Sequence, residues 1–469
     1  MINNSLKIFS LISLLAVSLM ANEGPQQANG IKIGEVTAHS VIIWTRLTDG
    51  HAKFTTTEAE DRVRKQQLTP PKVAPGHTGQ VRITLTEQEQ QFFQSQWKDV
   101  NAQSDFTYQV MIDDLTPRST YQVRVDARYY CSETISSTSK GSFTTAPTPN
   151  DIVTAEVAIV TCQAIRSAED TRVGHSVYKQ MLELERPLDF FIHTGDILYY
   201  DKGYLAKNVR DARRKWNHTF ALPLNRDFSA QVPSFFMKDD HDTVTNDSDP
   251  SSVHGDLTFK QGIEIFTEQV PMGDLTYRRI RWGKDLELWL TENRDYRSVN
   301  KMKDGPNKTI LGAKQKKWLK DTIAASDATF KFIVTPGPII GPDKPGKNDN
   351  HANAGFFTEG EELRQFIATQ NNLYIICGDR HWQYASKHPK LGIREFGCGP
   401  INGQHMFGGA PKKDPKMHEF FNARGGFLTV KVERKGETPQ AILRWHDADE
   451  KDPKTGKQRI NHEIILDLQ

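Results

Sequence analysis

Four short apolar runs after residue 150 each end in side chains that can bind metal ions. The runs cover residues 157–160, 190–192, 234–237 and 373–377. An uninterrupted apolar run of this length is typical of a strand buried on both faces, as in the sheets of α/β proteins. Ligands collect just beyond the carboxyl ends of such strands. We therefore expect the residues that follow the four runs to lie together in one site.

Before residue 146 the pattern differs, because apolar and polar residues alternate. Alternation predicts strands with one buried face, here over residues 80–85, 107–112 and 121–129, and the apolar run over 41–44 is expected to be a further strand. The run Asp114-Leu115-Thr116-Pro117 followed by Tyr121 resembles the turn and tyrosine corner of fibronectin-type and immunoglobulin-like sandwiches. Residues 87–100 lack the alternation and are expected to be a helical or irregular insertion.

A proline-containing linker over residues 144–149 divides the chain, since proline stops strand pairing. The pattern thus predicts a β-sandwich domain over 29–146 and a second domain over 150–469. In the second domain strands and helices alternate, which predicts layers of sheet and helix. Helices are expected over 171–185, 209–220, 256–269, 315–325 and 359–368, and further strands over 286–290, 330–334, 427–432, 441–445 and 462–468.

Composition limits the partners and the compartment. Lys and Arg number 60 against 58 Asp and Glu, so the net charge of +2 does not favour nucleic acid as a partner. Residues 1–21 read as a cleaved signal peptide whose apolar stretch, 8–19, is too short to span a bilayer. We expect a periplasmic or secreted protein without a membrane span in the mature chain. Four cysteines are too few for a disulfide framework, and a Cys377–Cys398 bridge stays open.

The residues after the four runs carry the candidate chemistry. They are Cys162, then Asp196 and Tyr199, then the run Asp239-Asp240-His241-Asp242, and finally Asp379-Arg380-His381. Packed together, the carboxylates would repel one another, and burying each unpaired charge costs several kcal/mol. A bound cation removes that penalty, and thiolate, phenolate, imidazole and carboxylate are all metal ligands. The sequence therefore predicts a metal site with more than one ion.

Such a site suits hydrolysis of phosphate esters, because two ions stabilise the attacking and the leaving oxygen. Asp196 is expected to bridge the ions, and metal-bound hydroxide attacks phosphorus. His241 is expected to protonate or stabilise the leaving oxygen. Arg380 is expected to assist by holding phosphate oxygens. Arg166 and Asn246 are candidate substrate-binding residues, and Asn246 can also offer an oxygen to an ion.

These motifs resemble those of PhoD-like alkaline phosphatases, in the calcineurin-like metallophosphoesterase superfamily. The resemblance rests on Gly195-Asp196-x-x-Tyr199, on residues 239–242, on Gly378-Asp379-Arg380-His381 and on Cys162-Gln163, with later landmarks at 294–297 and 311–319. It implies a four-layer αββα sandwich behind an all-β fibronectin- or immunoglobulin-like domain. Two departures are Asp242, where glutamate is commoner, and the missing twin-arginine signal.

The resemblance also implies the cofactors Fe(3+) and Ca(2+). Carried over by residue, Cys162, Asp196, Tyr199 and His381 would hold iron, and Asp196, Asp240, Asp379 and Asn246 would serve calcium. The predicted function is a secreted alkaline phosphatase or phosphodiesterase acting on small phosphate esters. One alternative is a narrow phosphodiesterase that acts on phospholipid headgroups or teichoic acids. The other is a non-catalytic surface protein that binds carbohydrate or protein.

Overall fold

The computed structural model describes residues 24–51, 54–55, 69–165, 167–344, 346–403, 412–456 and 458–468. The predicted signal peptide, residues 1–21, and the candidate substrate ligand Arg166 lie outside these residues. Within them, no helix is both long and apolar enough to cross a bilayer.

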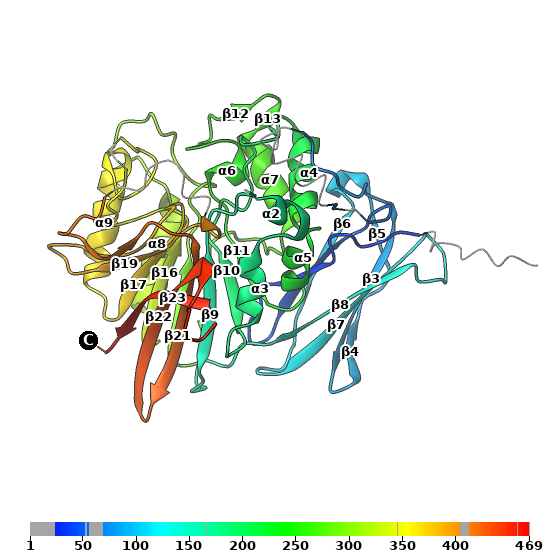
Figure 1. Ribbon diagram of the computed structural model, residues 1–469, viewed down its shortest axis with the longest axis horizontal. Helices are drawn as coiled ribbons and strands as arrows, with labels where there is room; N and C mark the ends of the chain where they lie inside the picture. The colour runs from blue at the N-terminus through cyan, green and yellow to red at the C-terminus, as the bar shows by residue number, and fades with distance from the viewer. Residues whose placement is uncertain are drawn as a thin grey trace, which may run out of the picture.

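A nine-stranded sheet contains strands from both ends of the described chain, from the N-terminal strands (blue) to the C-terminal strands (red) in Figure 1. Its central strands β9, β10 and β11 are parallel, and each reads as a fully buried run. In order across the sheet the strands are β23 (Gln458–Leu466), β22 (Thr438–Lys451), β21 (Gly426–Lys435), β9 (Ala155–Val160), β10 (Phe190–His193), β11 (Ser234–Phe236), β1 (Ile31–Gly34), β2 (Val41–Arg46) and β6 (Thr107–Ile112).

A seven-stranded sheet faces the first. Its strands β15, β16, β17 and β19 are parallel. Strand β14 pairs antiparallel with β15, and β18 pairs antiparallel with β19. In order they are β14 (Arg278–Trp282), β15 (Leu286–Leu290), β16 (Phe330–Thr335), β17 (Leu373–Cys377), β19 (Arg394–Cys398), β18 (Gln383–Lys387) and β20 (His418–Asn422). Between the sheets lies the largest apolar core, to which Ile159, Ile192 and Phe332 contribute.

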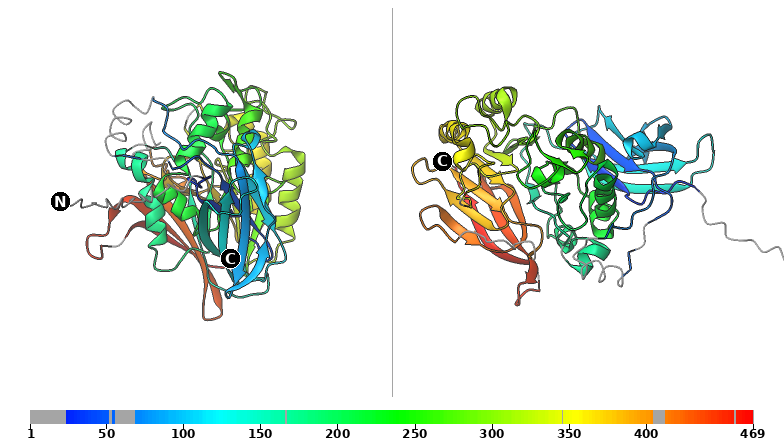
Figure 2. Two further views of the ribbon diagram at one scale, coloured as in Figure 1. Left: turned by 90° about the vertical axis from the view of Figure 1, so that its right-hand side faces the viewer. Right: turned by 90° about the horizontal axis from the view of Figure 1, so that it is seen from above.

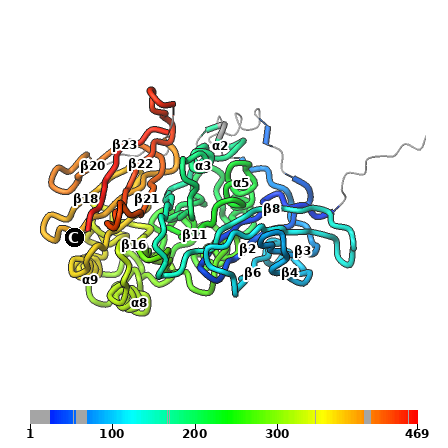
Figure 3. Tube along the Cα trace, turned by 90° about the horizontal axis from the view of Figure 1, so that it is seen from below, coloured from blue at the N-terminus to red at the C-terminus, as the bar shows by residue number. Residues whose placement is uncertain are grey.

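Helices cover the outer face of each sheet, as Figure 3 shows, with α3 and α5 on one side and α8 and α9 on the other. Tyr178 of α3 (Ser176–Leu182) and Phe228 of α5 (Pro223–Ser229) pack on Phe191 of β10. On the opposite side, α8 (Gly312–Ala324) and α9 (Phe357–Ala368) bury their apolar stripes against Ile333 and Ile375. The predicted αββα sandwich is therefore confirmed.

A five-stranded sheet completes the N-terminal β-rich part, at the right of Figure 1 and, in the right-hand view of Figure 2, at the end away from the C-terminal strands. It packs on β1, β2 and β6 through residues such as Ile33, Ile43 and Val125. The predicted tyrosine corner is present, since the Thr116 N–H donates to Tyr121 Oη at 3.0 Å. Its strands are β4 (Gln90–Gln94), β3 (Gly79–Glu87), β7 (Thr120–Arg128), β8 (Ser137–Thr144) and, paired with β3, β5 (Lys98–Val100).

The two parts of the chain share one sheet, because β1 pairs in parallel with β11 through Gly34 and Ser234. Strands from both sides of the predicted domain boundary near residues 146–150 thus hydrogen-bond in the same layer. The boundary itself stays a prediction. The shared layer ties the N-terminal strands directly to a strand whose tip carries candidate site residues.

Three expectations about secondary structure were wrong. Residues 87–100 are not helical: β4 and β5 pair with β3 there, and because β4 is mostly exposed it lacks the alternation that marks a half-buried strand. The helix expected over 171–185 is two helices, α2 (Ala168–Val173) and α3. Gly174 breaks it at φ 97°, where a Cβ would lie 2.3 Å from Asn225 Oδ1.

The helix expected over 256–269 begins later, so Asp256 lies outside it. α7 (Phe259–Gln269) is capped by Thr258, whose hydroxyl accepts from the Gln261 N–H in a capping box. The preceding residues form the two-stranded ribbon of β12 (Val253–His254) and β13 (Leu257–Thr258). α4 (Val209–Thr219) matches its expected bounds closely, and α6 (Asp240–Thr243) lies in the acidic run that follows β11.

Candidate metal centre

Three overlapping groups of potential ligands lie where the buried strands end. Within each group, one ligand atom of every member lies within 4.8 Å of the others. Asp196 belongs to the first two groups and Asp240 to the last two, so the groups are connected in series. The groups are Cys162, Asp196 and His381; Asp196, Asp240 and His241; and Asp240, Asp247 and Asp349.

The strand tips place these side chains through unusual backbone angles. Cys162, Asp196 and Asp379 have φ values of 55°, 56° and 57°, in the left-handed region. A non-glycine residue there costs roughly 1–3 kcal/mol and persists where the surrounding structure imposes it, commonly at functional sites. Gly195, at φ 115°, lets the chain pass close to the next tip, since a Cβ there would lie 2.8 Å from the Asp239 backbone nitrogen.

Cys162, Asp196 and Tyr199 make direct contact in a buried cluster. Asp196 Oδ2 lies 3.4 Å from Cys162 Sγ and 3.0 Å from Tyr199 Oη. Burial raises the pKa of both the Cys162 thiol and the Tyr199 phenol, and the Asp196 carboxylate adds to the effect. Burial also raises the pKa of Asp196, aided by repulsion from Asp240. Without a cation, the ionised forms of these three side chains are disfavoured. A bound cation would favour the ionised forms.

The residues fit bound ions on two observations. Asp196 Oδ1 is buried and has no hydrogen-bond partner, so one carboxylate oxygen is available to a ligand. The donor types also differ along the series. The thiol, phenol and imidazole near the Asp196 carboxylate suit a transition or trivalent ion. The group of Asp240, Asp247 and Asp349 offers only carboxylate oxygens, which suit a hard cation or an ammonium group.

His241 is held by a carboxylate that the sequence did not single out. Asp201 Oδ1 lies 2.6 Å from His241 Nδ1, and Asp201 Oδ2 accepts from the Asn246 N–H at 3.1 Å. Burial works to lower the pKa of His241, but Asp240 and Asp201 outweigh it and raise the pKa. The Asn246 side chain itself is exposed. His241 is thereby oriented with Nε2 as its remaining ring nitrogen.

Of the three carboxylates in the acidic run, Asp240 alone joins the ligand groups. Asp239 is paired with Arg294, whose Nε donates to its Oδ1 at 2.7 Å. Asp242 is a capping-box residue that accepts from the Leu198 N–H at 2.8 Å and the Asp239 N–H at 3.0 Å. Of its carboxylates the run therefore supplies one potential ligand, Asp240, while Asp239 and Asp242 stabilise the surrounding structure.

Asp379 and Arg380 lie together rather than on the ligand groups. The Arg380 guanidinium pairs with the carboxylates of Asp379 and Asp343, and its side chain is 2% exposed. The Asp379 N–H donates to Thr161 Oγ1 at 3.1 Å, which joins the tips of β17 and β9. His381, two residues on, does join the group of Cys162 and Asp196.

Asp349 was missed by sequence reasoning and comes from the loop between β16 and η2 (Ala354–Phe356). That loop is rich in Gly, Pro, Asn and Lys. The signal was present, because the loop follows β16, a further strand buried along nearly its whole length. Cys377 and Cys398 both carry free thiols, and Cys398 Sγ lies 3.7 Å from the Cys377 carbonyl oxygen.

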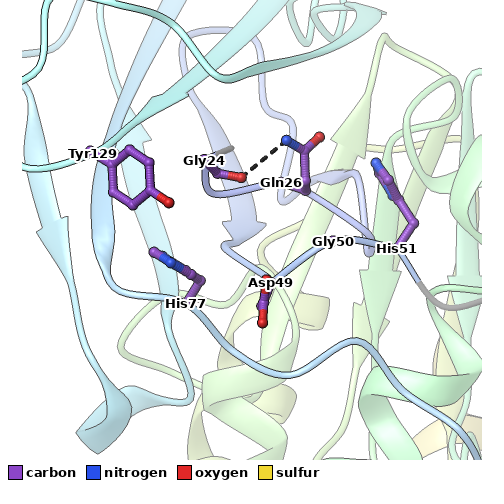
Figure 4. Close-up of a pocket in the computed structure, with 7 residues that line it drawn as sticks. All are labelled: Gly24, Gln26, Asp49, Gly50, His51, His77 and Tyr129. Atoms are coloured by element: carbon purple, nitrogen blue, oxygen red, sulfur yellow. Dashed lines mark hydrogen bonds between the residues drawn. The ribbon is translucent and has the colours of Figure 1, made fainter. Parts of the chain in front are cut away.

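A separate pocket of about 450 Å³ lies in the N-terminal β-rich part (Figure 4). The rings of His77 and Tyr129 meet edge to face there with centroids 5.4 Å apart. Its lining residues are Gly24, Gln26, Asp49, Gly50, His51, His77 and Tyr129. Among the described residues, no residue of this pocket belongs to a three-member group of potential metal ligands.

Comparison with solved structures agrees with the fold described above. The structure superimposes on a solved structure titled "Structure of PhoD" with a TM-score of 0.70 at 18% identity, covering 94% of this chain and 90% of that one. It superimposes on a purple acid phosphatase, PPD1, from yellow lupin seeds with a TM-score of 0.64 at 10% identity, covering 93% of this chain and 74% of that one. Both likenesses concern the fold.

The sequence comparisons identify the family. Alkaline phosphatase D of Bacillus subtilis (strain 168) is 22% identical over 393 residues, in a match that covers 69% of this chain and 64% of the relative's own length. Residues 15–147 match the family model for the PhoD-like phosphatase N-terminal domain. Residues 157–440, more than half of the chain, match the model for the PhoD-like phosphatase itself. The chain therefore belongs to the PhoD-like phosphatase family.

Proposed function

We propose that this protein is a secreted, metal-dependent phosphatase that hydrolyses small phosphate esters at alkaline pH. The observation that carries the proposal is the connected series of buried ligand groups at the strand tips. Family membership supports the reaction class, and the printed name of the Bacillus subtilis relative supports the alkaline phosphatase activity. Secretion is proposed from the apolar stretch near the N-terminus.

The proposed ligands follow the chemistry of each group. Fe(3+) would be held by the thiolate of Cys162, the phenolate of Tyr199, the imidazole of His381 and the carboxylate of Asp196. Asp196 and Asp240 would serve a neighbouring Ca(2+), with Asn246 and Asp379 as further oxygen ligands. Asp379 is paired with Arg380 in the structure, so its service to calcium requires that ion pair to open.

When bound, the ions supply an activated water nucleophile and neutralise charge on the phosphate. The protein's own contribution begins with His241, which Asp201 orients through Nδ1. Its Nε2 then donates a proton to the departing oxygen of the ester. Arg380 and Arg166 are proposed to hold phosphate oxygens, because a guanidinium fork matches two of them.

The proposal is tested with Asp196→Asn. The variant keeps the shape of the side chain but removes the charge shared by the first two ligand groups. We expect a folded protein with lost iron and hydrolysis reduced by roughly 10³-fold or more, since the metal chemistry as a whole is removed. Elemental analysis, circular dichroism and rates on nitrophenyl phosphate measure the three quantities. Full activity in the folded variant refutes the proposal.

Substrate class is tested in the same assay. Rates on nitrophenyl phosphate and on bis(nitrophenyl) phosphate are compared for the wild-type protein at matched concentrations. Comparable rates support a broad phosphatase and phosphodiesterase. Hydrolysis of the diester alone supports the narrow phosphodiesterase, and absence of both activities in iron-loaded protein supports a non-catalytic binding protein.

A further inference from the structure

We propose that the ammonium group of Lys347 occupies the third cation position of the centre, so that the protein binds ions at two positions and not at three. The inference rests on the proposed function and assigns a role to a residue that no sequence motif marked. The third position is the group of Asp240, Asp247 and Asp349, whose carboxylate oxygens lie within 4.8 Å of one another.

Lys347 lies directly on this group. Its Nζ pairs with Asp247 Oδ1 and lies 3.7 Å from Asp349 Oδ2. The lysine side chain is 19% exposed, and that of Asp349 is 2% exposed. An ammonium group is a compact point charge with three donors, and it therefore serves carboxylates from several directions as a small cation does.

The other cations nearby have different partners. Arg294 lies 4.0 Å from Asp349 Oδ2, but its guanidinium donates to Asp239 and to the Ser248 carbonyl. Arg297 contacts Asp349 through the backbone carbonyl, at 2.8 Å from Nη2. Lys347 is thus the described cation that pairs with both Asp247 and Asp349. A divalent ion in the same place would repel the ammonium group. Two unit charges about 4 Å apart near a protein surface interact with about 4 kcal/mol.

The loop that carries Lys347 is anchored, which keeps the ammonium in place. Upstream, the buried carboxylate of Glu395 accepts from the N–H groups of Ile339, Ile340 and Gly341 at 2.6, 2.8 and 2.9 Å. Downstream, the Arg364 guanidinium donates to the His351 carbonyl at 2.8 Å. On the facing loop, Asn300 Nδ2 donates to the Asp247 carbonyl at 2.6 Å. Hydrogen bonds therefore hold both the segment that carries Lys347 and the segment that carries Asp247.

The chemical consequence is a positive charge at the edge of the centre that does not depend on calcium concentration. Lys347 extends the series of positive charges that begins with the ion at Cys162 and Asp196. It is a positioning and charge-balancing residue, since its contacts are to Asp247 and Asp349 and not to the atoms of the reaction.

The experiment counts bound ions in full-length protein. Wild-type protein, Lys347→Met, Lys347→Arg and the matched surface control Lys301→Met are loaded with iron, titrated with Ca²⁺ by calorimetry, and analysed by mass spectrometry for metal content. Lys301 is an exposed residue of a neighbouring loop. We expect one iron and one calcium in the wild-type protein, in Lys301→Met and in Lys347→Arg. We expect one additional calcium in Lys347→Met, because Asp247 and Asp349 then lose their cation beside Asp240.

The outcomes separate this inference from the proposed function. A second calcium in the wild-type protein overturns the inference, as does a folded Lys347→Met that gains none. If Lys347→Met does not fold, as thermal unfolding would show, the wild-type and Lys347→Arg counts still decide. Absence of phosphate-ester hydrolysis with the expected ion counts would refute the proposed function and leave the role of Lys347 intact.

Discussion

Arg294 and Asp239 join the tips of the two sheets across the centre. Asp239 follows β11 in the nine-stranded sheet, and Arg294 follows β15 in the seven-stranded sheet. The Arg294 Nε donates to Asp239 Oδ1 at 2.7 Å, and both side chains are at most 3% exposed. Nearby, Lys238 Nζ reaches Glu292 Oε2 at 2.7 Å from the same two tips. Two buried ion pairs thus connect the sheets at the strand tips near the ligand groups.

Removing one member of this pair should destabilise the protein strongly. Arg294→Met leaves the Asp239 carboxylate buried and unpaired, which costs about 3–5 kcal/mol. Chemical denaturation monitored by fluorescence measures the loss. The matched control is Arg444→Met, which opens the more exposed pair with Glu463 on the sheet edge and should cost no more than about 1 kcal/mol. Equal losses in the two variants would contradict the stabilising role of the buried pair.

Asp201→Asn should slow turnover without unfolding the protein. The variant keeps a hydrogen-bond acceptor for His241 Nδ1 but removes the charge that orients and supports the imidazole. Outer partners of this kind are worth roughly 10–100-fold. The measurement is kcat and KM across pH. We expect kcat to fall, KM to change little and the pH profile to shift, whereas Asp256→Asn, at an exposed site, should leave all three unchanged. An unaltered profile would show that Asp201 does not act through His241.

Gly195→Ala should lower both stability and metal content. An alanine Cβ there would approach the Asp239 backbone nitrogen to 2.8 Å, in a backbone conformation with φ 115° that disfavours side chains. The chain must shift, and Asp196 shifts with it. Gly436→Ala is the control, because Gly436 also has positive φ but has open space around it, so it should lose only about 1 kcal/mol and keep its ions. Elemental analysis together with thermal unfolding distinguishes the two.

Glu359 should contribute stability that is lost in acid. Burial alone would raise its pKa, but His351, Thr309 and the Ile310 N–H outweigh burial and lower the pKa to about 2. Because the folded pKa lies below the ordinary value of 4.5, the stabilisation is full above pH 4.5 and disappears as the pH falls toward 2. The amount is on the order of 3 kcal/mol.

The corresponding experiment compares urea unfolding of wild-type protein and Glu359→Gln between pH 3 and pH 7. The wild-type protein should lose the Glu359 contribution only in the part of this range below pH 4.5, and the variant should start lower and show a flatter dependence there. Glu463→Gln, on the exposed edge strand β23, serves as the control with a wild-type slope. Parallel curves for wild type and Glu359→Gln would exclude this carboxylate as a source of acid lability.

Tyr199→Phe should abolish the visible absorption of the iron-loaded protein. The phenol lies 3.0 Å from Asp196 Oδ2 in the first ligand group, and a phenolate bound to iron(III) absorbs visible light. Tyr204→Phe is the control, since Tyr204 Oη donates instead to Asp211 Oδ1 at 2.8 Å on α4 and should leave the spectrum unchanged. A retained band in iron-replete Tyr199→Phe would remove Tyr199 from the ligand set.

Local patterns predicted the parts of the fold that carry a strong local signal. The buried runs that became β9, β10, β11 and β17 were recognisable because each is apolar along nearly its whole length. Strands β4 and β5 were not recognisable, because they have little buried face and are held by hydrogen bonds to β3. The break at Gly174 could not be predicted either, because it depends on the close contact with Asn225, about fifty residues further along the chain.

The candidate site divides in the same way. The sequence by itself placed Cys162, Asp196, Asp240 and His381 at strand tips, and the structure brings them into connected ligand groups. Only the tertiary structure decided that Asp201 contacts His241, that Asp379 pairs with Arg380, and that Lys347 pairs with Asp349. The physical reason is that an apolar run indicates a buried strand from local sequence alone. The partner of a loop side chain, in contrast, is set by packing between segments far apart in the chain.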